Sequence, residues 1–338
     1  MPPVQVNQSR RVLIIHKGCR VHTWSEDLAG GFREIGCEAQ VLALRSWNWS
    51  ERREQWTGGG KLWENRATME RCVRMISEFC PELIILLNYA GLPEATDSMI
   101  RAAAGSKVPI IGCLADHIAA LPAKARPNLN GVYAFDSATL DVLGKAYHGS
   151  GARLEFFPLA VNLSRYRNHG KSWSARRKGL VFLGNNTTER RAMVRELRNL
   201  GEVVSAYGPK AEAGLRFWRR RRISPQGAAH IYGSYQGVLN LLQAPNTING
   251  LNLRAFEVPA CGGLGTYPLT PDLAFSFDPG REIITYRDMA DLARQTRMLF
   301  NEPELAANVI AAGRARVMAE HTYAHRASRL VTDWLPAS

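Results

Sequence analysis

The chain has 338 residues, a length that predicts two domains of roughly 150 residues each rather than a single core. With 46% hydrophobic and 22% charged residues the composition is that of a globular protein, and no stretch reaches the ~20 apolar residues of a membrane-spanning helix. The formal charge of +13 predicts an anionic partner, but it does not distinguish a nucleotide diphosphate from an anionic lipid, an acidic glycan or a nucleic acid.

The N-terminus and the cysteines indicate the compartment. Residues 1–10 are polar and lack the apolar core of a secretory signal, which predicts a cytoplasmic protein and leaves peripheral contact with the inner membrane face open. The six cysteines contain no CxxC pair, which argues against a zinc site and against a disulfide framework. We therefore expect reduced cysteines and no bound metal.

The first half alternates short apolar runs with helical periodicity, the pattern of a parallel sheet covered by helices. We expect strands over 12–16, 39–43, 82–87, 109–113 and 131–135, and helices over 25–35 and 66–79. Residues 46–63 are rich in Trp, Gly and charge and follow neither period. They are predicted to form a long loop beside the strand ends, where open α/β sheets bind ligands, and to shape an acceptor site.

The apolar periodicity stops over residues 157–173, and a second α/β pattern follows. We expect strands over 179–183, 203–207 and 237–242, and helices over 188–200, 225–235, 254–260, 289–301 and 303–321. The sequence therefore predicts an α/β protein with two Rossmann-like domains, residues 1–160 and 177–325. Residues 161–176 are the predicted linker, and residues 326–338 a tail that crosses back to the first domain.

The most informative segment is 246–265, in which a loop rich in Gly and Asn runs into a helix. Such a loop leaves unpaired N–H groups at the positive end of a helix, so it predicts an anion site that fits a diphosphate. Glu257 lies on the first helical turn between apolar neighbours, and its carboxylate must find hydrogen-bond donors. Ribose hydroxyls would serve, and so would the N–H groups of its own helix; the residues alone leave both open.

Five motifs in this half carry a resemblance. They are R-x-F-E-x-x-A-C-G-G at 254–263, T-P-D at 270–272, F-D-P-G-x-E-I at 277–283, A-G-R-x-R-V at 312–317 and E-H-T-Y-x-H-R at 320–326. In these the chain resembles the CgeB-type glycosyltransferases, which are related to glycosyltransferase family 4. The resemblance covers residues 179–330 and implies a GT-B enzyme: two Rossmann-like domains facing across a cleft, with a nucleotide-sugar on the second and an acceptor on the first.

The resemblance also implies donor-site roles. In family 4 enzymes an acid pair in the pattern E-x7-E marks this site, and Glu257 takes the second place, on the ribose. The first place, near the sugar, falls on Asn249, which keeps hydrogen-bonding capacity but loses the charge. The phosphates would then face the backbone N–H groups of Gly250, Leu251, Asn252 and Leu253.

GT-B enzymes generally need no metal, because a helix dipole and basic side chains neutralise the leaving diphosphate. Arg190 and Arg254 are the candidates for this role, since a guanidinium suits phosphate oxygens; ordinary surface positions are the alternative. Arg254 and Glu257 are accordingly predicted to take part in catalysis. Gly184 and Asn185 follow the strand expected over 179–183 and precede Arg190. A small residue at this strand end lets the backbone approach the donor.

Tyr207 ends the next predicted strand and either flanks the nucleotide base or belongs to an ordinary turn.

On the acceptor side, Lys17, Gly18 and Arg20 follow the first predicted strand, and Asp116 and His117 follow the fourth. If the reaction inverts the anomeric centre, Asp116 is the better general base. If it retains configuration, no base is needed and His117 stabilises charge by hydrogen bonding. The family resemblance favours retention.

The leading prediction is therefore metal-free transfer of a sugar from a UDP-, GDP- or dTDP-sugar to an acceptor hydroxyl, with no further cofactor. The acceptor is left open among a glycan, a lipid-linked saccharide, a protein, a small molecule and a nucleic acid. A modified nucleic-acid base is the sharper alternative, and a non-catalytic sugar-nucleotide- or glycan-binding module, favoured by Asn249, is the other. A dehydrogenase is excluded because no GxGxxG follows either domain's first strand.

A basic run over residues 216–222 bears on the acceptor. It contains Arg216, Arg219, Arg220, Arg221 and Arg222, interleaved with two aromatic residues. Such a run is predicted to contact an anionic surface, either nucleic-acid phosphates or lipid headgroups.

Overall fold

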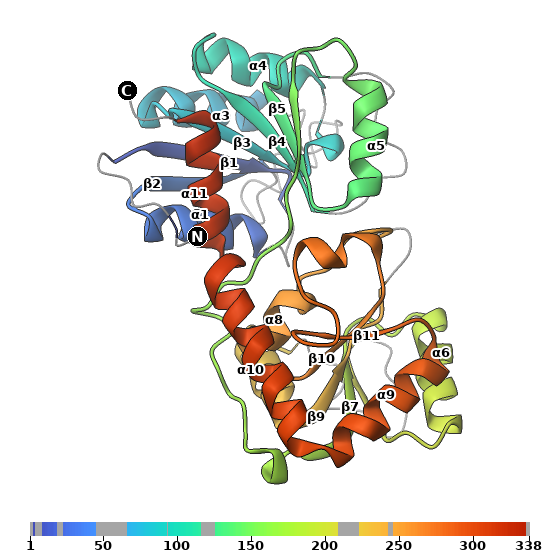
Figure 1. Cartoon of the computed structure of the whole chain (residues 1–338). Coiled ribbons are helices and arrows are strands. Elements are labelled where there is room, and N and C mark those ends of the chain that lie inside the picture. The colour runs from blue at the N-terminus through green and yellow to red at the C-terminus, as the bar shows by residue number, and fades with distance from the viewer. Residues whose placement is uncertain are drawn as a thin grey trace. The chain divides into compact units, whose positions relative to one another are not determined.

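The computed structural model describes residues 3, 9–18, 23–44, 66–92, 94–115, 126–208, 223–242 and 246–335. The chain divides into two compact units, Met1–Pro158 with Tyr323–Ser338, and Leu159–Thr322. Each unit is built on a parallel β-sheet with helices packed against it (Figure 1), so the predicted α/β class with two Rossmann-like halves is confirmed.

The first unit contains a six-stranded sheet in the order β2-β1-β3-β4-β5-β6. Its strands are β1 (Arg11–His16), β2 (Glu38–Ala43), β3 (Leu83–Leu87), β4 (Ile110–Leu114), β5 (Gly131–Ala134) and β6 (Arg153–Phe156). Its helices are α1 (Trp24–Glu34), α3 (Arg66–Phe79), α4 (Glu94–Ala104), α5 (Ser137–Ala146) and α11 (Tyr323–Trp334), with a 3-10 turn η1 (Tyr89–Gly91). Strands β3 and β4 are buried at every residue, because helices cover both faces of a parallel sheet.

The C-terminal helix is an integral part of this first unit. Figure 1 shows α11 beside α1, and a Cβ added at Gly31 of α1 would lie 2.3 Å from the Tyr323 carbonyl oxygen. At the other end of α11 the Tyr133 hydroxyl donates to Asp333 at 2.7 Å and accepts from the Trp334 indole N–H at 2.8 Å. The C-terminal helix therefore packs against elements from the N-terminal half of the chain and completes the first unit.

The second unit contains a five-stranded sheet in the order β11-β10-β9-β7-β8. Its strands are β7 (Arg177–Leu183), β8 (Val204–Tyr207), β9 (Tyr235–Leu239), β10 (Gly265–Pro268) and β11 (Ile284–Tyr286). Its helices are α6 (Thr188–Asn199), α7 (Pro225–Ser234), α8 (Arg254–Ala260), α9 (Met289–Asn301) and α10 (Pro303–Glu320), with 3-10 turns η2 (Trp173–Ala175) and η5 (Pro271–Phe275). The side chains of Thr187, Ser224 and Asp288 cap α6, α7 and α9, which explains where these helices begin.

The segment predicted to be a linker lies against the second unit. The N–H of His169 donates to the Cys261 carbonyl oxygen, and that of Lys171 to the Gly233 carbonyl oxygen, both at 3.1 Å. The buried guanidinium of Arg176 donates to the Gly262 carbonyl oxygen at 2.8 Å. The Gly-Gly pair of the A-C-G-G motif thus belongs to a packing surface for this segment.

Candidate functional site

Two arginines of the second unit meet over one aromatic ring. Phe182 lies near the end of β7 and is fully buried. The guanidinium carbons of Arg190 and Arg254 lie 5.7 and 5.8 Å from the centre of its ring, within the range of a cation–π contact. This cluster is at the carboxyl ends of β7 and β9, the edge at which open parallel sheets bind ligands.

Arg254 is held by a pair of side-chain amides. Its Nη1 donates to Asn240 Oδ1 at 2.8 Å, and its backbone N–H donates to Asn252 Oδ1 at 3.1 Å. The amides of Asn240 and Asn252 also exchange two hydrogen bonds of 3.0 Å. The Tyr267 hydroxyl accepts from the Asn252 N–H at 2.7 Å, so the pair is fixed to β10 as well.

This support for Arg254 is uncharged. Among the residues that the structure describes, no carboxylate forms an ion pair with its guanidinium. The amides orient the side chain without cancelling its positive charge. An anion is therefore the ligand that this half-buried group favours, because a guanidinium presents several N–H donors in a planar fork.

Arg190 has a different environment. It is only 5% exposed, and it donates to the carbonyl oxygens of Asn185 at 3.1 Å and Leu241 at 2.7 Å. Burial, followed by the positive charge of Arg254, lowers the pKa of Arg190 to about 10. It stays charged at neutral pH and joins the segments that follow β7 and β9, so it contributes charge while positioning the backbone.

Two glycines make room for this cluster. A Cβ added at Gly184 would lie 2.9 Å from Arg254 Nη2, and one added at Gly208 would lie 2.1 Å from the Gly184 carbonyl oxygen. Gly208 also has a φ of +126°, which L side chains rarely adopt. Asn185 is exposed, and the half-buried Tyr207 places its hydroxyl 2.9 Å from that of Tyr235.

The predicted phosphate-binding loop is partly engaged within the protein. The N–H of Asn252 is bound by Tyr267, and the carbonyl oxygen of Asn249 accepts from the Asp272 N–H at 3.1 Å. Gly250 and Leu251 are buried. The helix α8 that follows has only seven residues and contains Pro259, so its dipole is short and Arg254 is the main source of positive charge.

Glu257 lies on the first turn of α8 and is 7% exposed. It is close to the buried Tyr232 hydroxyl: burial, followed by the Glu257 charge, raises the pKa of Tyr232, and a hydrogen bond with Arg254 opposes the rise. Arg254 and Glu257 thus share Tyr232 as a neighbour, which is consistent with a single site containing both.

The acceptor-side candidates are described only in part. Gly18 has a φ of +93°, and its N–H donates to His16 Nδ1 at 3.2 Å; Lys17 between them is half-buried. Outside the described residues are Arg20, Asp116, His117, the loop 46–63 and the arginines at 216, 219, 220, 221 and 222.

The sequence analysis missed Asn240, Phe182 and His16. Asn240 and His16 share one signal: each is a polar residue at the carboxyl end of a buried apolar strand. Phe182 carries no such signal, because a buried aromatic in a strand is ordinary core until the two arginines are placed beside it.

The described residues also bear on disulfides, metal binding and membrane spans. The described cysteines are all free, and only Cys80 among them is exposed. In the described ranges no group of three or more His, Cys, Asp or Glu side chains could hold a metal ion. Of the helices that the structure describes, none has the length and apolar character to cross a membrane.

Two comparisons with known proteins concern the amino-acid sequence of the chain. Residues 187–332 match the model of a family described as glycosyl transferase-like. No curated protein sequence matches the chain. The CgeB-type resemblance therefore stays a prediction.

Solved structures resemble the whole chain in fold. Sucrose-phosphate synthase from Thermosynechococcus elongatus has 13% identity and a TM-score of 0.62, over 97% of this chain and 100% of that one. HepE from Anabaena, solved with UDP and glucose, has 11% identity and a TM-score of 0.60, over 96% and 99%. A glycosyltransferase from Rickettsia africae has 9% identity and a TM-score of 0.60, over 98% and 100%. The chain has the GT-B fold, and the family match over its second half supports a glycosyltransferase.

Proposed function

We propose that the protein transfers a sugar from a nucleotide-diphosphate sugar to an acceptor hydroxyl, with the donor diphosphate bound at Arg254. The observation that carries this proposal is the guanidinium of Arg254, oriented at the end of the sheet by neutral amides. The structural relatives lend support, since HepE has been solved with UDP and glucose and also with UDP-glucose.

In the proposed reaction, the arginines stabilise the negative charge of the leaving diphosphate. The bond between the anomeric carbon and the phosphate oxygen breaks, and negative charge develops on the departing diphosphate. Arg254 stabilises that charge from a preorganised position, with Arg190 adding to the local positive potential. The family resemblance favours retention, in which the acceptor oxygen replaces the phosphate on the same face of the sugar and the acceptor proton passes to the leaving phosphate.

We assign the remaining donor contacts from the same resemblance. Glu257 would accept hydrogen bonds from the ribose hydroxyls, and Asn249 would face the transferred sugar. The N–H groups of Leu251 and Leu253 would donate to phosphate oxygens, while that of Asn252 stays with Tyr267. Because guanidinium groups supply the positive charge, the reaction needs no metal.

Thermal-shift titration with UDP, GDP, dTDP and their sugars tests the proposal. A ligand at 100 times its Kd stabilises the folded protein by about 2.7 kcal/mol, which is readily measured. We expect one nucleotide to stabilise the wild type and Arg254→Gln to bind it at least about tenfold more weakly. Arg281→Gln is the matched control, because Arg281 has an 80% exposed side chain in the same unit. Equal nucleotide affinity in the two variants would show that Arg254 does not bind the donor.

The charge distribution favours a second candidate, an anionic acceptor such as nucleic acid. Residues 159–322 contain 23 Lys and Arg against 13 Asp and Glu, so most of the excess charge belongs to the second unit. Binding of duplex DNA, measured by fluorescence anisotropy, should then fall steeply between 50 and 200 mM salt. A binding module without catalysis is the remaining alternative, and measurable hydrolysis of the donor would exclude it.

A further inference from the structure

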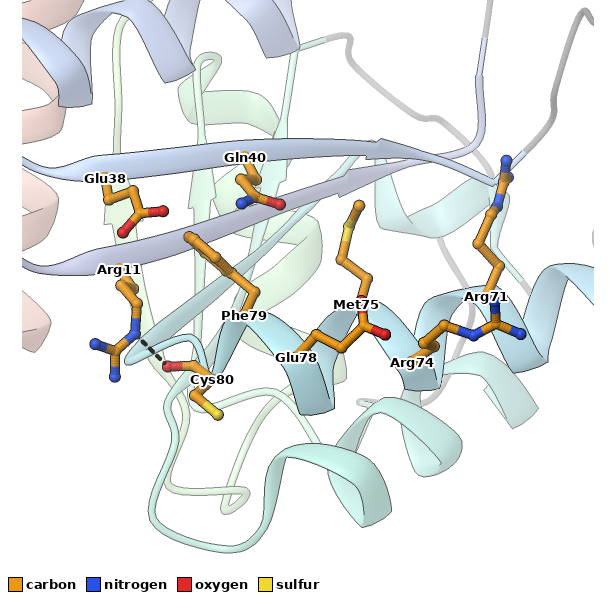
Figure 2. Close-up of a pocket in the computed structure, with 9 residues that line it drawn as sticks. All are labelled: Arg11, Glu38, Gln40, Arg71, Arg74, Met75, Glu78, Phe79 and Cys80. Atoms are coloured by element: carbon orange, nitrogen blue, oxygen red, sulfur yellow. Dashed lines mark hydrogen bonds between the residues drawn. The ribbon is translucent and has the colours of Figure 1, made fainter.

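A second candidate site lies in the first unit, in an open groove of about 630 Å³ between β2 and α3 (Figure 2). This volume is typical of ligand-binding pockets. The residues that line the groove are Arg11, Glu38, Gln40, Arg71, Arg74, Met75, Glu78, Phe79 and Cys80. Because Arg11 and Glu38 begin β1 and β2, the groove includes the amino ends of these strands, opposite to the edge that binds substrates in open α/β sheets.

The groove interrupts the apolar face of the sheet. On the face of β2 that α3 covers, Leu42 and the following Leu44 belong to the core, whereas Glu38 and Gln40 are polar. Strands under a helical layer are normally apolar throughout. Beneath these polar groups lie the buried ring of Phe79 and the partly buried Met75, which form an apolar floor.

The polar side chains around this floor keep most of their hydrogen-bonding capacity. Within the described chain, those of Glu38, Gln40, Arg74 and Glu78 make no hydrogen bond and no ion pair. Arg74 and Glu78 are four residues apart on α3, a spacing at which opposite charges commonly pair. Figure 2 shows these groups around the groove; the hydrogen bond that it marks among the residues drawn joins Arg11 Nε to the Cys80 carbonyl oxygen, at 2.9 Å.

A β-strand is a poor occupant, because arginines cap the outer edge of β2. The guanidinium of Arg33 donates to the Ala39 carbonyl oxygen at 2.7 and 3.1 Å, and that of Arg71 to the Ala43 carbonyl oxygen at 2.7 Å. These carbonyl groups are the ones that an added strand would need. The occupant must therefore be recognised by side chains.

The charges identify the class of ligand. The lining carries charges of both signs: the guanidinium groups of Arg11, Arg71 and Arg74, and the carboxylates of Glu38 and Glu78, which form no ion pair within the described chain. A strongly anionic ligand such as a nucleoside diphosphate would be repelled by the two unpaired carboxylates of this mixed set. A neutral ligand with many hydroxyl groups matches it, since each hydroxyl both donates and accepts and the C–H face of a sugar ring suits an apolar floor.

We propose that this groove binds a neutral oligosaccharide and holds a glycan acceptor at the amino ends of β1 and β2. The proposal deepens the function above and rests on it. The donor end of the reaction belongs to the second unit, so binding in the groove and binding of a nucleotide can be measured separately on the same full-length protein.

The test is a glycan array carrying neutral and uronic-acid-containing oligosaccharides of two to six sugars, followed by calorimetry of the strongest binder. We expect a neutral oligosaccharide to bind, and Glu38→Gln and Glu78→Gln each to weaken it about tenfold. Asp141→Asn is the control, since Asp141 is exposed on α5 of the same unit. Melting temperatures check that the variants fold.

Failure to bind any neutral oligosaccharide would overturn the proposal, and so would a preference for anionic ones. Binding that survives both glutamate substitutions would overturn it as well. The nucleotide-induced thermal shift, measured on the same samples, reports on the donor site independently. A normal nucleotide-induced shift without oligosaccharide binding would contradict the glycan-binding proposal and leave the proposed function intact. Oligosaccharide binding without a nucleotide-induced shift would contradict the proposed function.

Discussion

Each unit holds an arginine over an aromatic ring, and the two arginines have opposite kinds of partner. In the first unit Arg126 lies 5.3 Å from the centre of the Tyr89 ring, and its Nη1 contacts both carboxylate oxygens of Asp97 at 2.9 and 3.0 Å. The two side chains of this ion pair are only 3% and 2% exposed. In the second unit Arg254 lies over Phe182 and contacts the neutral amide of Asn240.

We propose that this difference separates a structural cation, Arg126, from a ligand-binding one, Arg254. A carboxylate satisfies Arg126 within the protein, so that guanidinium has no charge left for a ligand and its loss would be felt as instability. An amide gives Arg254 a hydrogen bond and a direction but leaves its charge uncancelled. In both places a guanidinium lies over an aromatic ring and donates to a side-chain oxygen. That oxygen belongs to a carboxylate at Arg126 and to an amide at Arg254, and Arg126 is buried whereas Arg254 is half-buried.

The largest expected effect follows from breaking the buried pair. Asp97→Asn leaves Arg126 without its counter-charge in a dry environment and should lower the free energy of unfolding by about 3–5 kcal/mol. Urea denaturation followed by fluorescence measures this, with Asp141→Asn as an exposed control that should change little. A loss below 1 kcal/mol would mean that the pair is not structural.

The opposite substitution, which adds a carboxylate beside Arg254, should change the affinity for the ligand rather than the stability of the fold. Asn240→Asp places a carboxylate on Arg254 and makes the second unit resemble the first. We expect nucleotide-diphosphate affinity to fall between about tenfold and a hundredfold, because the guanidinium is then neutralised within the protein. Calorimetry measures the affinity, and Asn308→Asp, on the exposed side of α10, adds the same charge elsewhere in the unit. Unchanged affinity in Asn240→Asp would contradict a phosphate role for Arg254.

A smaller effect is expected at Glu257, which is proposed to contact the ribose and not the charge centre. Glu257→Ala should lower the affinity for nucleoside diphosphates by about tenfold. The affinity for inorganic pyrophosphate, which lacks the ribose, should not change. Competition calorimetry with both ligands separates the two. An equal loss for both would show that Glu257 acts through Arg254 or through the helix.

Long periodic elements could be predicted from the sequence, and short ones could not. The predicted helices 66–79 and 289–301 coincide with α3 and α9, whose amphipathic patterns extend over several turns. The four residues of β10 and the three of β11 are too short for any period to be visible. Helix α5 was missed although Asp136 caps its start, accepting from the Ala138 N–H at 3.0 Å.

Residues of the candidate site could be proposed from the sequence where a local motif contains them. Arg254 and Glu257 lie three residues apart on one helix, and the sequence motif alone is enough to make both of them candidates. Asn240 precedes them by a whole loop, and it is the hydrogen bond that its Oδ1 accepts from Arg254 Nη1 that shows how it orients this arginine. Local pattern therefore indicates which residues carry charge, whereas tertiary contacts decide whether that charge is cancelled.

The smallest expected effect concerns metal. If uncancelled guanidinium charge is what stabilises the departing diphosphate, EDTA should change the rate of transfer by less than about twofold, because no divalent cation is required to balance it. The measurement is donor turnover before and after chelation, with Mg²⁺ added back. A loss restored by Mg²⁺ would assign the positive charge at the diphosphate to a metal, and the amide support of Arg254 would then have to be explained by packing alone.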